Sequence, residues 1–182
     1  HEDKRYTDIR NYYGKNFWWQ SYAILFLAQG TFMAIMATPL ILIQTTNFTE
    51  PTTFQLAIRP IAWAFWLLGM TIESQSDYQL LQFKTQHPKQ LCTVGWWRYS
   101  RHPNYFGEII IWWSMYAIFI SHCEINFYSL AASISPLFIT VAIIHLSGVL
   151  RMEKTMPSRY KEFPEYAKKT SMLIPWWPKE KN

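Results

Sequence analysis

The sequence contains few cysteines, and their positions argue against two classes of protein. Cys92 and Cys123 are the two cysteines among its 182 residues. Neither belongs to a cysteine–histidine spacing typical of a metal site, and we expect them at opposite ends of the molecule, too far apart for a disulfide. Internal repeats, low-complexity segments and a secretory signal peptide with its cleavage site are also lacking. The sequence therefore predicts neither a disulfide-stabilised domain nor a metal site.

Formal charge is absent from four stretches, and this absence is the strongest indication of structure. Residues 16–49 and 125–150 hold no Asp, Glu, Lys or Arg. Each exceeds the roughly 20 mostly apolar residues with which a helix crosses a bilayer. Residues 60–72 and 109–123 are also uncharged but shorter, so their helices must extend past a charged residue to cross. The mean hydropathy of −0.07 hides this segregation.

The pattern predicts an all-α fold, a polytopic membrane helical bundle with four transmembrane helices. Proline is favourable at the first position of a helix because its missing N–H has no helical partner there, which suits Pro103. The whole chain, residues 1–182, is predicted as one domain. We expect the helices within residues 17–44, from Arg59 and Pro60 to about 83, from Pro103 to about 121, and from about 127 to 152.

The basic residues predict the orientation of these helices. Sixteen of the 17 lysines and arginines fall before the first helix, between the second and third, or after the fourth. Arg59 is the exception, in loops that also carry Glu50 and Glu124. The positive-inside rule then places both visible ends and the central loop on the cytosolic side, or on the matrix side in an organelle. This orientation explains the pI of about 9.2, so we expect membrane lipid as a partner and no nucleic acid.

Ionisable side chains near the helix ends are the candidate functional groups. Glu73 and Asp77 share one face of the second helix. Glu108 lies one turn into the third helix, and Arg151 ends the fourth. Such groups are costly at membrane depth, so they usually face a cavity or a charged partner. Two interpretations stay open: a functional pocket, or salt bridges from arginines such as Arg101 to Asp77 or Glu108 that only hold the helices together.

The central loop and the start of the third helix carry a motif. Residues 95–108 run G-W-W-R-Y-S-R-H-P-N-Y-F-G-E, which resembles the signature of the steroid-5α-reductase-like membrane oxidoreductases, in their DUF1295-type branch. The resemblance implies that the four helices are part of a six- or seven-helix fold, with the family's N-terminal helices before residue 1. Further similar blocks follow in the same order: Phe17-Trp18-Trp19, Gly69 with Ser76-Asp77-Tyr78, Ser147-Gly148-Val149, Glu153-Lys154 and Leu173-Ile174-Pro175-Trp176.

The resemblance implies an NADPH pocket between the helices, open to the basic face. Asn104 matches the asparagine that holds the nicotinamide amide, and an asparagine can donate to and accept from a carboxamide at once. Matching cations would offset phosphate charge, and matching carboxylates would orient those cations or bind ribose hydroxyls. The implied cofactor-binding residues are Asp77, Lys84, Arg101, His102, Asn104, Tyr105, Glu108 and Arg151.

The sequence departs from the steroid reductases at positions that matter for chemistry. Glu73 stands where those enzymes have asparagine, and Thr155 lies near the position of one of their histidines. Their proton-donating tyrosine and its glutamate lie on helices before the equivalent of His1. Reduction of an enone needs a hydrogen-bond donor at the carbonyl to stabilise the developing enolate. The sequence identifies no catalytic residue for this task.

Three functions are compatible with these residues. The first is an integral membrane NADPH-dependent oxidoreductase that reduces a C=C bond of a steroid or other lipid, favoured by Asn104 and the Ser76-Asp77-Tyr78 block. The second is a lipid methyltransferase similar to the isoprenylcysteine carboxyl methyltransferases, which share R-H-P-x-Y-x-G and bind S-adenosylmethionine. The third is a non-catalytic subunit that keeps the fold within a larger membrane protein complex.

Overall fold

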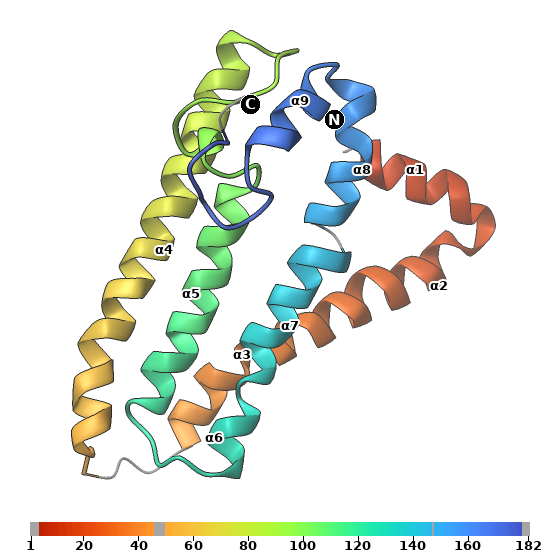
Figure 1. Cartoon of the computed structure of the whole chain (residues 1–182). Coiled ribbons are helices and arrows are strands. Elements are labelled where there is room, and N and C mark those ends of the chain that lie inside the picture. The colour runs from red at the N-terminus through yellow and green to blue at the C-terminus, as the bar shows by residue number, and fades with distance from the viewer. Residues whose placement is uncertain (1–3, 46–49, 147, 180–182) are drawn as a thin grey trace.

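The computed structural model describes residues 4–45, 50–146 and 148–179 (Figure 1). Every regular element within these ranges is a helix, apart from an isolated β-bridge between Ser100 and Ser171. The predicted all-α class is therefore confirmed. Ser147, from one of the family-like blocks, and His1 lie outside the described residues.

The first long helical segment follows a short helix set at an angle to it (Figure 1). After α1 (Lys4–Tyr13) and a 3-10 turn, α2 (Phe17–Ser21) passes through a π-helical turn, Tyr22–Leu27, into α3 (Ala28–Thr45). The helix predicted within residues 17–44 is confirmed. Most of its described side chains are exposed within this chain. An apolar helix exposed in this way needs lipid or further helices around it.

The next helix, α4 (Thr53–Gln86), starts earlier than predicted. The expected start at Arg59 and Pro60 is wrong, because a capping box at Thr52 and Gln55 begins the helix at Thr53. The Thr52 hydroxyl accepts from the N–H of Gln55 at 3.3 Å, and the Gln55 side chain accepts from the N–H of Thr52 at 2.9 Å. These bonds satisfy two backbone donors that have no partner within the helix. Pro60 is accommodated inside α4.

Helix α5 (Pro103–Ile120) begins at its proline as predicted and lies beside α4 (Figure 1). The two helices approach closely because glycines meet at the contact. A Cβ atom added at Gly107 would lie 2.7 Å from the backbone nitrogen of Glu73 and 2.8 Å from the carbonyl oxygen of Gly69. Any side chain there would push the helices apart. Small residues at such contacts are typical of helix pairs in membranes.

Polar side chains of α4 bind the far end of α5. The Gln55 amide donates to the carbonyl oxygens of Ile120 at 3.1 Å and of Cys123 at 2.6 Å. Arg59 donates to the carbonyl oxygen of Ser121 at 2.9 Å. Carbonyls at the end of a helix have no partner within it, so these bonds cap α5. Arg59, the exception in the distribution of basic residues, thus has a structural role.

The last hydrophobic stretch is not the single helix predicted to end near residue 152. Helicity is interrupted at Gly148, where an added Cβ atom would collide with the carbonyl oxygen of Ile143, and it then continues to Arg159. The elements in order are α6 (Phe127–Ala131), α7 (Ile134–Val141), a π-helical turn (Ala142–Leu146), α8 (Val149–Arg159) and the short α9 (Phe163–Lys169).

Three segments are long and apolar enough to cross a membrane, namely Arg10–Gln44, Thr53–Gln86 and Phe127–Arg159. They support the predicted class of membrane protein. Helix α5 is not among them, because its first turns are polar and include Glu108. The apolar part of α5 is therefore shorter than the roughly 20 residues that a helix needs to cross a bilayer. The count of four transmembrane helices therefore stays a prediction.

The main core lies where α3, α7 and the start of α8 meet. Its buried members are Met36, Ile139, Ile143 and Val149. The buried Ser135 hydroxyl donates to the carbonyl oxygen of Met36 at 3.0 Å, which ties α7 to α3. A second buried cluster, near the C-terminal end of α5, consists of Phe119, Cys123 and Ala132.

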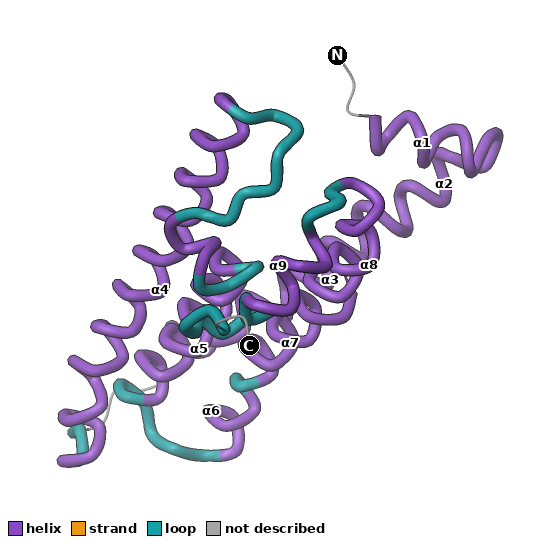
Figure 2. The backbone as a smooth tube through the Cα atoms, turned by 45° about the horizontal axis from the view of Figure 1, so that its top comes forward, coloured by secondary structure: helices purple, strands orange, loops and turns teal. Residues whose placement is uncertain are grey.

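The central loop (residues 87–102) and the C-terminal tail (residues 170–179) lie at the same end of the helices (Figures 1 and 2). The Arg101 N–H donates to the carbonyl oxygen of Ser171 at 2.9 Å, and the Trp176 N–H donates to that of Tyr99 at 2.9 Å. Two of the three basic groups of residues therefore share one end, as the charge distribution predicts. Helix α1 lies toward the same end (Figure 1).

Replacing Gly107 with alanine is expected to destabilise the protein by about 1–3 kcal/mol, the usual cost of overpacking a tight contact. The added methyl group would displace α4 at Gly69 and Glu73. Unfolding in detergent, followed by circular dichroism, measures the change. Gly30→Ala is the matched control, because nothing lies within 4 Å of a Cβ atom placed there. Equal stability of the two variants would contradict the close packing of α4 on α5.

Candidate functional site

The central loop is held by α4 on one side and by α9 on the other. Its 3-10 turn, Gly95–Arg98, positions Trp97, whose indole N–H donates to the carbonyl oxygen of Ser76 in α4 at 2.9 Å. The Tyr166 hydroxyl of α9 donates to the carbonyl oxygen of Trp97. Burial raises the pKa of the Tyr166 phenol, so it stays a neutral donor. The loop is therefore fixed before it reaches α5.

Arg101 connects this loop to α8 and α9. Its Nε and Nη2 atoms donate to the two carboxylate oxygens of Glu153 at 2.9 and 2.8 Å. Its Nη1 donates to the carbonyl oxygens of Ala167 and Thr170 at 2.8 and 2.6 Å. A bidentate arginine–carboxylate pair is strong because both partners are charged and the geometry is fixed. All three nitrogen atoms of the guanidinium group are therefore hydrogen-bonded within the protein.

His102 binds the same carboxylate. Its Nε2 lies 2.9 Å from Oε1 of Glu153, and its side chain is 1% exposed. Because an ionised carboxylate only accepts hydrogen bonds, Nε2 carries the hydrogen. The other ring nitrogen, Nδ1, is buried and has no hydrogen-bond partner within the described part of the chain. Leaving such an atom unpaired costs about 1–3 kcal/mol, which makes Nδ1 a candidate position for a hydrogen bond from a bound group.

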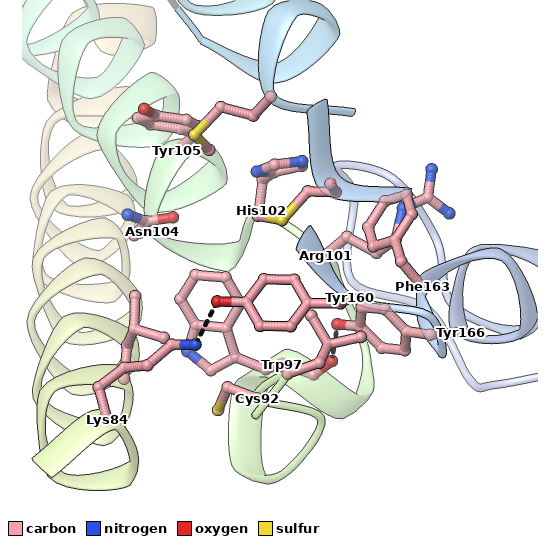
Figure 3. Close-up of a pocket in the computed structure, with 14 residues that line it drawn as sticks. Lys84, Cys92, Trp97, Arg101, His102, Asn104, Tyr105, Tyr160, Phe163 and Tyr166 are labelled. Carbon is pink, nitrogen blue, oxygen red and sulfur yellow. Dashed lines mark hydrogen bonds between the residues drawn. The ribbon is translucent and has the colours of Figure 1, made fainter. Parts of the chain in front are cut away.

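A cavity of about 280 Å³ opens beside His102, among α4, α5, α8 and α9 (Figure 3). This volume is just below the range of pockets that bury a drug-sized ligand, about 300–1,000 Å³. Apolar and aromatic side chains form most of its wall, and polar groups are few. Five of the eight residues predicted for cofactor binding line it: Lys84, Arg101, His102, Asn104 and Tyr105.

Asn104 presents an unsatisfied acceptor at this cavity. Its amide nitrogen donates to the carboxylate of Asp77 at 3.0 Å, which orients the side chain between α5 and α4. Its amide oxygen is buried and has no hydrogen-bond partner in the described residues. In Figure 3 this oxygen points away from α4, into the space between Lys84 and His102. Asp77 thus acts on the cavity through Asn104 without lining it.

Lys84 and Tyr160 close one side of the cavity. The Lys84 ammonium donates to the Tyr160 hydroxyl at 2.7 Å and to the carbonyl oxygen of Gln90 at 2.5 Å. It also lies 4.6 Å from the centre of the Tyr160 ring. These contacts join the end of α4 to the residue that follows α8. Both hydrogen-bond acceptors are neutral, so the ammonium keeps a net positive charge available to an anionic group.

Two predicted residues lie elsewhere. Glu108 is close enough to Asp77 and Glu73 for the three carboxylates to interact electrostatically, and it does not line the cavity. Arg151 is exposed on α8 and does not line it either, contrary to the expectation that it converges there with Asn104. Its predicted contact with a cofactor stays a prediction.

Glu153 is the residue of this site that sequence reasoning missed. It lies 52 positions after Arg101, and Arg101 pairs with it rather than with Asp77 or Glu108 as the structural interpretation expected. The tail also supplies the aromatic wall of the cavity, through Tyr160, Phe163 and Tyr166. The aromatic content of residues 160–177 was the available signal for this wall.

Together these features define a helical membrane protein with a largely apolar cavity, and two open polar atoms, at its basic end. A family model described as "Protein of unknown function (DUF1295)" matches residues 1–170. The chain belongs to this family, so the DUF1295 part of the predicted resemblance is confirmed. No solved structure matches the chain.

Replacing Arg101 with lysine is expected to destabilise the protein by about 1–3 kcal/mol, because one ammonium cannot reach both Glu153 oxygens and the two carbonyls. The detached tail should then be cut faster by trypsin, as measured by limited proteolysis in detergent. Lys89→Arg, at an exposed position in the same loop, is the control. Unchanged proteolysis of Arg101→Lys would show that the tail is held by other contacts.

Cys92 lines the cavity as a buried thiol, and burial raises its pKa. Because the thiolate is the reactive form, we expect slow alkylation by iodoacetamide, with the rate rising at a higher pH than for an ordinary thiol. Mass spectrometry of a Cys123→Ser protein measures it. The control is a Val94→Cys, Cys92→Ser, Cys123→Ser protein, whose new thiol occupies a position where valine is 52% exposed. Equal rates would contradict the buried position of Cys92.

Proposed function

We propose that the protein is an NADPH-dependent reductase of a C=C bond in a steroid or other lipid. The observation that carries the proposal is the Asn104 amide, whose nitrogen is bound by Asp77 while its buried oxygen has no partner in the described residues. The carboxamide NH₂ of nicotinamide supplies the donor that this oxygen lacks. The similarity of residues 95–108 to the steroid-5α-reductase-like group supports the same cofactor.

The proposal includes the membrane arrangement. We infer that α5 is the fourth transmembrane helix, since its glycine contact holds it against α4, and that these helices are part of a six- or seven-helix fold. The positive-inside rule supports a cytosolic or matrix position for the cavity end. A lipid substrate dissolved in the bilayer would then meet a cofactor from the aqueous side.

The cavity suits one end of NADPH rather than the whole molecule. Its volume of about 280 Å³ fits a ring system with its carboxamide, below the range for a complete drug-sized ligand. Lys84 would neutralise phosphate charge at the cavity. Arg101 would contribute little, because Glu153 and two carbonyls already bind it. Arg98 and Arg151, both exposed near this end, are further cations for the phosphates.

The chain's own residues would bind, orient and exclude water. When bound, NADPH supplies the hydride for the reaction. Asn104 would fix the rotation of the nicotinamide ring through its carboxamide. The apolar wall, including Met152, Met156 and Phe163, would accept an apolar substrate and keep the site dry, which strengthens each electrostatic contact within it.

The two alternative functions, a non-catalytic subunit and a lipid methyltransferase, are supported to different degrees. The engagement of Arg101 in structural contacts favours a non-catalytic subunit, because it removes one of the cations that a dinucleotide needs. A methyltransferase is disfavoured by charge, since S-adenosylmethionine is a sulfonium cation and the Lys84 ammonium, whose hydrogen-bond acceptors are neutral, lines the cavity. A second cation beside this ammonium would be repelled.

Asn104→Ala is expected to weaken NADPH binding by about 1–3 kcal/mol, because the carboxamide would be left without a partner in a buried site. Titration of the purified protein in detergent, followed by energy transfer from tryptophan to NADPH, measures the affinity. Trp97 lines the cavity as a nearby donor. Lys89→Ala is the control, because Lys89 is exposed and does not line the cavity.

A parallel titration with S-adenosylmethionine separates the alternatives. Its tight binding, with no binding of NADPH, would overturn the reductase and support a methyltransferase. Binding of neither compound would support the non-catalytic subunit. Equal losses in Asn104→Ala and Lys89→Ala would show that binding reflects general charge at this end and does not depend on the Asn104 amide.

A further inference from the structure

His102 has features that cofactor binding by Asn104 does not use. Its ring lines the cavity, and the side chain is 1% exposed. Nε2 is bound by Glu153 at 2.9 Å, whereas Nδ1 has no partner within the described residues. The ring also stacks on Tyr105, with 5.9 Å between the ring centres and 18° between the planes. The imidazole is thus held in one orientation, with Nδ1 as its open atom.

A carboxylate that accepts a hydrogen bond from one nitrogen of an imidazole often positions that ring to act as a general acid. It fixes which nitrogen carries the hydrogen, and it stabilises the ring when the second nitrogen is protonated. In the protonated ring of His102, Nε2–H donates to Glu153 and Nδ1–H becomes a buried donor that has no acceptor among the described residues. A carbonyl oxygen in the cavity is the kind of group that this donor fits.

We propose that His102 is the proton donor of the reductase, acting through Nδ1 on the carbonyl of an α,β-unsaturated ketone, with Glu153 as its positioning residue. The inference rests on the proposed function and supplies the donor that the sequence alone did not identify.

The proposed step balances. Addition of hydride to the β-carbon forms a C–H bond and shifts the C=C electron pair toward the carbonyl oxygen as an enolate. The Nδ1–H bond of His102 breaks and an O–H bond forms, which leaves an enol and a neutral imidazole. The enol becomes the ketone by gaining a proton at the α-carbon and losing its O–H proton. Water returns a proton to His102, and NADPH is oxidised to NADP⁺.

The proposed proton transfer predicts the direction in which kcat depends on pH. Within the described residues, Glu153 of α8 is the carboxylate that contacts the ring, and Arg101 shares it. The proposed step consumes a proton carried by the ring, so kcat should fall as pH rises. The other titratable side chains that line the cavity are Lys84 of α4, Cys92 of the central loop, Tyr105 of α5, Tyr160 before α9 and Tyr166 of α9.

The test compares wild type with His102→Gln in detergent, using 2-cyclohexenone and a 3-oxo-4-ene steroid as probes. Glutamine can still donate a hydrogen bond to Glu153, but it cannot deliver a proton. We expect kcat to fall by about 10²–10⁴-fold, the usual contribution of a general acid. NADPH affinity should change less than threefold. Tyr105→Phe removes the hydroxyl of the ring that stacks on His102, and it should retain the pH dependence of wild type.

The outcomes separate this inference from the proposed function. Failure of wild type to bind NADPH would overturn both. NADPH binding without reduction of either probe, or equal kcat in wild type and His102→Gln, would overturn the inference and leave the cofactor site standing. If His102→Gln unfolds or loses NADPH affinity, the pH dependence of the wild-type kcat tests the inference instead. A kcat that does not fall with rising pH would exclude an acidic imidazole, and a fall that persists in His102→Gln would assign it to another group.

Discussion

The ion pair between Arg101 and Glu153 is the contact on which the functional end of this protein depends. It joins the central loop to α8, and the same guanidinium holds the carbonyl oxygens of Ala167 and Thr170. The pair is shielded, with 11% and 16% of the two side chains exposed, so loss of either partner would leave a poorly solvated charge. Because Glu153 also binds His102, one carboxylate both assembles the cavity and orients a ring inside it.

The packing of α4 against α5 has a comparable role between the long helices. The contact between Gly69 and Gly107 brings the helices close enough for Asn104 at the start of α5 to reach Asp77 on α4. A wider separation would break that hydrogen bond and leave the amide free to rotate. The helix contact and the amide orientation are therefore parts of one arrangement, although two turns of α4 separate Gly69 from Asp77.

The polar groups at the cavity explain why binding and chemistry are proposed there. The open oxygen of Asn104 requires a donor, and the open nitrogen of His102 fits a carbonyl when the ring is protonated. Lys84 adds positive charge at one side. In the proposed reaction a nicotinamide would supply that donor and an enone that carbonyl, and the apolar wall of the cavity would exclude competing water.

Much of the fold followed from the sequence, because solvation and helix formation are local. The charge-free stretch predicts a helix in an apolar environment, which the structure shows from Phe17 to Thr45, and Pro103 marks the start of α5. The start of α4 differs from the one that Pro60 predicts, because the pairing of Thr52 with Gln55 begins the helix two turns earlier. For the site, the motif identified Asn104, and the structure brings Lys84, Arg101, His102 and Tyr105 to the same cavity. The partner of Arg101 and the outward position of Arg151 depend on how α8 is placed after the interruption at Gly148. That placement is set by packing between residues far apart in the chain, which no local pattern records.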